Sequence, residues 1–212
     1  MGNKRIRFEP GGIYHIYNHG NADDLIFRED TNYDYFIKRY QKYIPDVADT
    51  FAYCLMPNHF HFAVRLKGKD DLFPIIKAKY PETDPQRFQN FADLFLNQFK
   101  NLLISYAKAF NKMYNRKGSL FLDNLNRKLI DSEEYFTRTI RYIHLNPVTH
   151  GFCQKPNDWQ YSSYNSYLSN RPTLLFREEI IKQFGGKENF IKYHSNPQSF
   201  ENFADLEHRF IT

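Results

Sequence analysis

Apolar and polar residues alternate in the segment 59–67, HFHFAVRLK, which has the two-residue period of a β-strand. Successive side chains of a strand point to opposite faces of the sheet. One face of this segment is apolar and carries Phe60, Phe62, Val64 and Leu66. The other face carries two imidazoles and two cations, from His59, His61, Arg65 and Lys67, with Ala63 between them. The pattern predicts a strand with one face in a core and one face suited to binding or chemistry.

Neighbouring segments complete a predicted antiparallel sheet. The segment 50–56, TFAYCLM, is separated from 59–67 by Pro57-Asn58, a pair typical of tight turns, so the two segments form a predicted hairpin. The segment 12–20, GIYHIYNHG, is rich in β-forming residues and bounded by glycines, which predicts the first strand. A further strand is expected within 116–130, after a turn glycine.

Helical spacing of apolar residues predicts three helices. Residues 31–44 have aromatic residues at helical spacing and stop before Pro45. Residues 91–113 carry one long stripe, made of Phe91, Leu94, Phe95, Phe99, Leu102, Leu103, Tyr106, Phe110 and Met113. The third helix is expected to start at Asp131 as N-cap, with Glu134 completing a capping box, and to stop before Pro147.

The remaining segments have weaker patterns. Residues 68–89 are polar and contain three prolines, which predicts a long surface loop. Short helices are expected around 177–184 and 199–210. The order strand, helix, hairpin, helix, strand, helix is typical of a ferredoxin-like, or RRM-like, α+β fold. Such a fold has an antiparallel sheet with helices on one face, and its other face is open to a substrate or a partner.

Composition narrows the class of protein. The chain has 212 residues and 18% aromatic residues, enough apolar surface to exclude a disordered chain. The net charge of +5 and the pI of about 9.0 slightly favour a polyanionic partner such as nucleic acid. Two cysteines give neither a disulfide framework nor a zinc site. No signal peptide and no apolar stretch near the ~20 residues of a membrane span are found, so a soluble, cytoplasmic protein without a membrane partner is expected.

A second pair of residues can join the two histidines. Tyr142 and Asn146 are four positions apart on the third predicted helix, so they project from the same side. Imidazoles and an amide oxygen can hold a divalent cation, and a phenol can attack a phosphorus atom. Each signal alone is common: His-x-His pairs arise by chance, and one helical tyrosine among sixteen is usually a packing residue.

The combined pattern is more specific. YCLMPNHFHFAVR, followed about eighty residues later by RYIHLNPVTHGF and DWQYSSY, resembles the single-tyrosine HUH transposases, in particular the branch of REP-associated tyrosine transposases. The resemblance covers roughly residues 10–167, so residues 1–167 are assigned to a catalytic domain and 168–212 to a C-terminal extension of unknown role. YHIYNHGN resembles the family's first strand, although relatives usually have a basic residue where this chain has His19.

The resemblance assigns roles to individual residues. His59-Phe60-His61 matches the histidine–hydrophobe–histidine motif that binds Mg²⁺ or Mn²⁺, and Asn146 occupies the place of a third metal ligand. Tyr142, before the Asn-Pro-Val turn, matches the nucleophile. The implied reaction is cleavage and rejoining of single-stranded, hairpin-forming DNA through a 5′-phosphotyrosine and a free 3′-OH. Some relatives form homodimers that exchange the tyrosine helix, whereas REP-type members can act as monomers.

DNA binding is expected to use cations near this site. The candidates are Arg65, Lys67, Arg116, Lys117, Arg127, Lys128, Arg138 and Arg141. Two other functions stay open from the residues alone. One is a metal-dependent phosphodiesterase that activates water and does not need Tyr142. The other is an inactive nucleic-acid-binding module, against which the absence of an RNP-type aromatic consensus counts.

Overall fold

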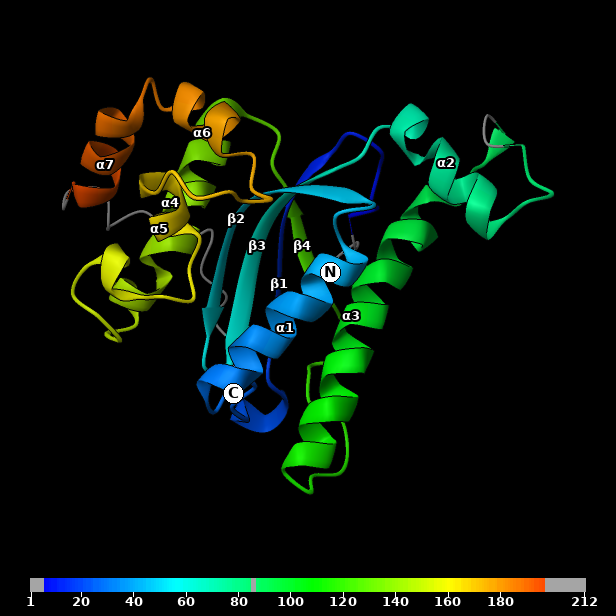
Figure 1. Cartoon of the computed structure of the whole chain (residues 1–212), viewed down its shortest axis with the longest axis horizontal. Helices are drawn as coiled ribbons and strands as arrows, with labels where there is room; N and C mark the ends of the chain where they lie inside the picture. The colour runs from blue at the N-terminus through cyan, green and yellow to red at the C-terminus, as the bar shows by residue number, and fades with distance from the viewer. Residues whose placement is uncertain (1–5, 85–86, 197–212) are drawn as a thin grey trace, which may run out of the picture.

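One antiparallel sheet organises the part of the chain that the computed structural model describes, residues 6–84 and 87–196 (Figure 1). Its strands are β1 (Ile13–His19), β2 (Ala48–Met56), β3 (His59–Leu66) and β4 (Asn126–Leu129), in the spatial order β2-β3-β1-β4. This order, with the first and third strands in the centre, is that of the predicted ferredoxin-like fold. β1 pairs with β3 so that His19 lies opposite His59.

The predicted hairpin is confirmed, with β2 and β3 joined at Pro57 and Asn58. The two faces of β3 divide as the alternation requires. The apolar face lies in the main core with Phe60, Phe62, Val64 and Leu66, whereas Ala63 belongs to a second core on the opposite face. His59 and His61 therefore lie on the same face as this second core.

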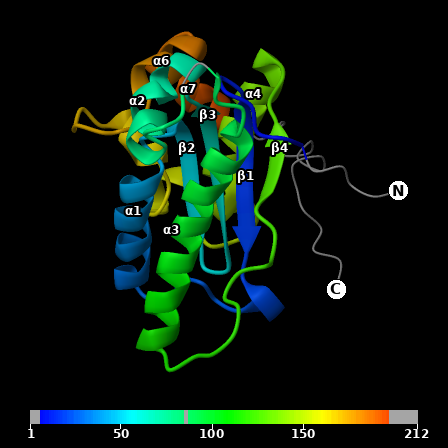
Figure 2. The same cartoon turned by 90° about the vertical axis from the view of Figure 1, so that its right-hand side faces the viewer.

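Helices α1 (Asp30–Tyr43) and α3 (Phe91–Met113) cover the face of the sheet that lies in the main core (Figure 2). Both confirm the predicted spans. In the stripe of α3, Phe95, Phe99 and Tyr106 are buried, whereas Leu103 is only partly buried and Met113 is exposed. The apolar stripe of α3 is therefore wider than the contact it makes with the main core.

Helix α4 (Glu133–Thr149) packs on the opposite face, against β2 and β3. The later helices α5 (Tyr164–Leu168), α6 (Arg177–Gln183) and α7 (Lys187–Ser195) extend the second core on this side, and α6 confirms the helix expected at 177–184. The α+β class and the antiparallel sheet are confirmed, and α1 and α3 share one face. The second face is partly covered by α4 rather than open.

Residues 68–89, expected to be a loop, contain the helix α2 (Lys69–Lys79) with Pro74 inside it. The negative charges of Asp70 and Asp71 in its first turn interact favourably with the helix dipole. Leu72 and Ile76, one turn apart, are fully buried and pack the helix on the main core. This tertiary burial outweighs the backbone hydrogen bond that Pro74 removes. The loop prediction is therefore wrong for these residues.

The limits of α4 also differ from the prediction. Its N-cap is Ser132 rather than Asp131, since the Ser132 hydroxyl accepts a hydrogen bond from the Tyr135 N–H at 3.2 Å. The helix continues through Pro147 to Thr149. The helix predicted at 199–210 lies outside the described residues. Short 3₁₀ helices occur at η1 (Asn21–Asp23) and η3 (Pro156–Asp158). A search of the described helices finds none with the length and apolar character of a membrane span.

Candidate active site

The four residues singled out in the sequence meet between β3 and α4. His59 Nε2 lies 2.8 Å from Asn146 Oδ1, and His61 Nε2 lies 3.4 Å from Asn146 Nδ2. The two imidazoles come from alternate positions of one strand, and the amide approaches from the helix above them. Residues more than eighty positions apart thus share one polar cluster beneath α4.

Tyr142 lies one helical turn before Asn146 and beside the same histidines. Its ring meets the His61 ring edge-to-face, with ring centroids 5.3 Å apart, and the His15 ring in the same manner at 5.7 Å. The side chain is only 3% exposed. The structure therefore brings the predicted nucleophile and the predicted metal ligands together.

Each histidine has an outer partner at Nδ1. His59 Nδ1 lies 2.8 Å from Asn58 Oδ1, and His61 Nδ1 lies 3.0 Å from His15 Nε2. When Nδ1 carries the proton and donates it outward, Nε2 presents its lone pair inward, which is the usual arrangement of metal-binding histidines. Asn58 and His15 thus orient the two imidazoles. His15 is buried, and sequence reasoning did not identify its contact with His61.

The contacts of His59 provide a test of whether the site suits a cation. Both of its ring nitrogens face amide oxygens, Asn58 Oδ1 on one side and Asn146 Oδ1 on the other. A neutral imidazole has only one N–H, so His59 can donate to one of these oxygens at a time. Two imidazole nitrogens and an amide oxygen are ligand types that divalent cations accept, and these three groups lie within 3.4 Å of one another at Asn146. The residues present therefore fit the metal that the motif implies.

Two more histidines surround His59 on its outer side. The His19 ring stacks on the His59 ring at 5.6 Å between centroids and 8° between planes, and the His150 ring lies 5.4 Å from it. His59, at 8% exposure, is the most accessible of the predicted site residues His59, His61, Tyr142 and Asn146, and His150 is exposed. The cluster is therefore most accessible at the end where α4 finishes. Sequence reasoning assigned no role to His150, although this residue lies in the quoted segment RYIHLNPVTHGF.

A second tyrosine lies close to His61. The Tyr17 ring is 6.0 Å from the His61 ring, and Tyr17 lies opposite His61 in the pairing of β1 with β3. Burial raises the pKa of Tyr17 to about 12, with a smaller contribution from Tyr135. A phenol with a raised pKa is harder to ionise, which makes Tyr17 a poorer nucleophile than an unperturbed phenol.

The predicted DNA-binding arginines have very different surroundings. Arg65 forms ion pairs with Asp49 at 3.1 Å and Glu179 at 2.9 Å, and these partners raise its pKa. Arg116 pairs with Asp24. Arg141 is 1% exposed and donates to the Asn196 carbonyl at 2.5 Å, while burial lowers its pKa. These three guanidinium groups hold parts of the fold together.

The other predicted cations differ in exposure and in the face of the sheet on which they lie. Lys128 lies opposite His15 in the pairing of β1 with β4, hence on the histidine face, whereas Arg127 lies on the face of α3. Arg138 precedes Tyr142 by one turn and shares its side of α4. Lys117 is exposed and Lys67 is partly exposed. Lys128 and Arg138 are thus the cations that the structure brings nearest to the histidine cluster by strand and helix position.

The side of α4 away from the sheet is fixed by a buried histidine pair. His144 Nδ1 lies 2.9 Å from His194 Nε2 of α7, and His144 Nε2 lies 2.7 Å from the Ser163 hydroxyl. All three residues are at most 1% exposed. His144 would lie on the helix surface if α4 stood alone, but it is buried because α5 and α7 cover this side. The pair joins the helix of Tyr142 to the C-terminal extension.

This histidine pair predicts a pH dependence of stability. Burial lowers the pKa of His194 from 6.5 to about 3, so its neutral form is favoured in the folded state. Between these two values the unfolded chain takes up a proton that the folded chain does not. The free energy of unfolding should therefore fall on acidification, by up to ~1.4 kcal/mol per pH unit for this group. Urea unfolding at a series of pH values measures the slope.

The control for that measurement is His194→Gln, which removes the titrating group and keeps a polar side chain. Its free energy of unfolding should change less steeply between pH 6 and pH 4 than that of the wild type. Only the slopes are compared, so a general loss of stability in the variant does not affect the result. Equal slopes would show that His194 does not titrate differently in the two states.

Comparison with known proteins gives relatives in sequence and in fold. No protein-family model matches the sequence. A Haemophilus influenzae protein named as a REP-associated tyrosine transposase is 25% identical over 175 residues, covering 78% of this chain and 86% of the relative. A solved REP-associated tyrosine transposase bound to a REP hairpin has a TM-score of 0.58 at 16% identity, covering 81% of this chain and 89% of that chain. In sequence and in fold, the chain is similar to the REP-associated tyrosine transposases, as its motifs predicted.

Proposed function

We propose that this protein is a transposase-like nuclease that cleaves and rejoins single-stranded DNA through a covalent tyrosine intermediate. One observation carries the proposal: the Asn146 amide lies between the Nε2 atoms of His59 and His61, and Tyr142 lies one turn away beside the same rings. The names of the similar proteins support the reaction class, and the DNA bound to the solved relative supports a hairpin substrate.

The proposed reaction exchanges one phosphate ester for another. The Tyr142 phenol loses its proton to solvent, and its oxygen forms a bond to the phosphorus of a phosphodiester. The bond from phosphorus to the 3′-oxygen breaks, and that oxygen takes up a proton to give a free 3′-OH. The 5′ phosphate stays on Tyr142 as a phosphotyrosine. Attack by a 3′-OH on this ester reverses the exchange and rejoins DNA without ATP.

His59, His61 and Asn146 are the residues that would hold Mg²⁺ or Mn²⁺. The bound cation would offset charge on the phosphoryl oxygens and favour ionisation of the phenol. Asn58 and His15 keep the imidazoles in the orientation that this requires. Two histidines and one amide leave coordination positions for a phosphate oxygen and water.

The four central residues all come from a single chain. Tyr142 packs over the histidines of its own sheet, so the site does not need a tyrosine helix from a second copy. Homodimer formation stays a prediction. Lys128 and Arg138 are the cations we propose to contact the DNA backbone first, because both share a face with the site.

A covalent adduct is the expected product when the protein meets hairpin DNA and Mn²⁺. The single-stranded oligonucleotide is labelled at its 3′ end, since the proposed attack leaves the 3′ fragment on the protein. Denaturing gel electrophoresis should show the label moving with the protein. Release of the 3′ fragment without an adduct would favour water as the nucleophile, and binding without cleavage would favour an inactive binding module.

A further inference from the structure

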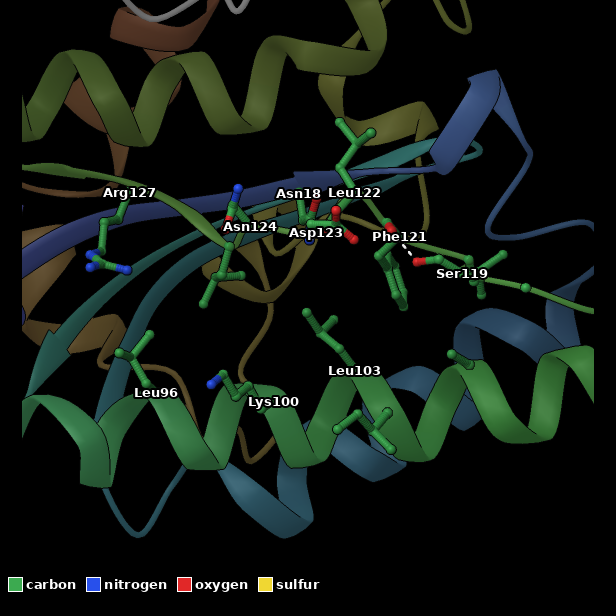
Figure 3. A pocket seen from close by; sticks show the side chains of 15 residues that line it. Asn18, Leu96, Lys100, Leu103, Ser119, Phe121, Leu122, Asp123, Asn124 and Arg127 are labelled. Carbon is green, nitrogen blue, oxygen red and sulfur yellow. Dashed lines mark hydrogen bonds between the residues drawn. The ribbon is translucent and has the colours of Figure 1, made fainter. Parts of the chain in front are cut away.

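A pocket of about 430 Å³ lies between α3 and the segment 118–127, away from the histidine cluster (Figure 3). Its apolar wall on α3 is formed by Leu96, Leu103, Ile104 and Ala107. Leu96, Leu103 and Ala107 follow the helical spacing of a second stripe beside the buried one. These three side chains are partly buried, and Ile104 beside them is 51% exposed. Phe121 lies at the opposite wall.

The two positively charged side chains of the pocket lie at one of its ends. Lys100 and Arg127 lie toward the same end as Leu96, while Phe121 and Ser119 lie at the other end (Figure 3). The Arg127 guanidinium is held over the Phe8 ring at 4.4 Å, and its Nε donates to the Ile6 carbonyl at 2.5 Å. Two cations therefore mark one end of the pocket.

Asp123 and Asn124 line the pocket from the chain segment before β4. Both are exposed, and neither has a hydrogen bond or ion pair within residues 6–84 and 87–196. Figure 3 shows the Asp123 carboxylate between the two ends of the pocket. A ligand that fills the space thus meets an acceptor-only carboxylate as well as apolar walls and cations.

The pocket and the histidine cluster lie on opposite faces of the sheet, at the C-terminal end of β1. Asn18 lines the pocket and donates to the Leu122 carbonyl at 3.1 Å, while the next residue, His19, stacks on His59. The Leu122 N–H donates to the His19 carbonyl at 3.0 Å. A chain that crosses the edge formed by residues 119–125 can therefore contact both places.

We propose that this pocket binds one unpaired nucleotide of the same DNA strand that reaches the histidine cluster, an inference that rests on the proposed function. The base lies in the space between the largely buried Phe121 and the partly buried apolar side chains of α3, where it is removed from water. The phosphate lies at the end marked by Lys100 and Arg127. This orientation keeps the phosphate away from the Asp123 carboxylate.

Asp123 gives the pocket a base preference. A carboxylate accepts two parallel hydrogen bonds from adjacent N–H donors, and among the four DNA bases guanine alone offers such a pair on its pairing edge. Thymine presents a single donor between two acceptors, and the amino groups of adenine and cytosine each lie beside an acceptor. The pocket should therefore favour guanine over the other three bases.

Fluorescence anisotropy with an oligothymidylate that carries a single guanine tests the proposal. Lys100→Ala should weaken binding, and Asp123→Asn should reduce the guanine preference by ~5-fold or more, the usual size of a lost bidentate base contact. The matched control is Lys108→Ala, since Lys108 is exposed on the same helix but does not line the pocket. Equal effects of Lys100→Ala and Lys108→Ala, or an unchanged preference in Asp123→Asn, would overturn the assignment.

Photo-crosslinking locates the base directly. An oligothymidylate with a single 6-thioguanine should crosslink to peptides that contain Leu103 or Phe121, and Ile104→Glu at the pocket rim should reduce this crosslink. A crosslink on other peptides would contradict the pocket as the base site.

Adduct formation at saturating DNA should persist in Lys100→Ala and Asp123→Asn. Loss of the guanine preference in Asp123→Asn, with the adduct still formed, would therefore support the pocket assignment separately from the proposed reaction.

Discussion

Tyr142→Phe is expected to abolish the covalent protein–DNA adduct while leaving the fold and the affinity for hairpin DNA nearly unchanged. The substitution removes only the hydroxyl, so the ring can keep its edge-to-face contacts with His15 and His61. No oxygen is then left at this position to attack the phosphorus. Denaturing electrophoresis with 3′-labelled DNA measures the adduct, and anisotropy measures binding.

Two tyrosines near the site provide matched controls. Tyr17 lies almost as close to His61 as Tyr142 does, and Tyr135 lies on the same helix, roughly 10 Å along its axis. Tyr17→Phe and Tyr135→Phe should both form the adduct, because both variants keep Tyr142 beside His61 and Asn146. Peptide mapping of the wild-type adduct should find DNA on YIHLNPV. An adduct on Tyr17 would show that the nucleophile is Tyr17 of β1 and not Tyr142.

His59→Ala and His61→Ala are each expected to lower the cleavage rate by about a thousandfold or more. Each substitution removes one of the two imidazole ligands, and metal stabilisation of a phosphoryl group contributes several kcal/mol. Affinity for hairpin DNA should change little, since contacts of cations with phosphates provide most of it. Single-turnover cleavage in Mn²⁺ gives the rates, and EDTA should stop the wild-type reaction.

His150→Ala is the control for these variants. His150 touches the His59 ring from the exposed side but lies outside the cluster formed with Asn146. Its removal should affect cleavage far less than removal of either inner histidine. Full wild-type activity in EDTA would exclude a metal at His59 and His61 and would contradict the proposed mechanism.

Local patterns predicted each of the two residue pairs of the central cluster, and the resemblance to a known family joined the pairs into one site. Alternation on β3 places His59 and His61 on one face, and a four-residue spacing on α4 places Tyr142 and Asn146 on one side. The role of His15 could not be predicted in this way, because its contact with His61 depends on the register between β1 and β3. Register is set by the whole sheet and not by either strand alone.

The helix α2 and the burial of His144 were also missed because they depend on contacts between distant segments. The helix α2 forms despite Pro74 because Leu72 and Ile76 are buried on a core made of distant segments. His144 is buried because α7, whose sequence has only a weak pattern, packs beside it. In both cases the deciding contact joins segments that are far apart in the sequence, and intrinsic propensity is weaker than such tertiary contacts.

The contact between His144 and His194 has a consequence for the motions of the molecule. The second core runs from β2 through α4 into α7, so opening of the C-terminal helices and opening of the tyrosine helix are expected to be coupled. Amide protons in the middle of α4 should then exchange with solvent as slowly as those of the sheet. The nucleophile would therefore be carried by a rigid part of the molecule, and the flexibility needed to thread and release a strand would have to come from the DNA.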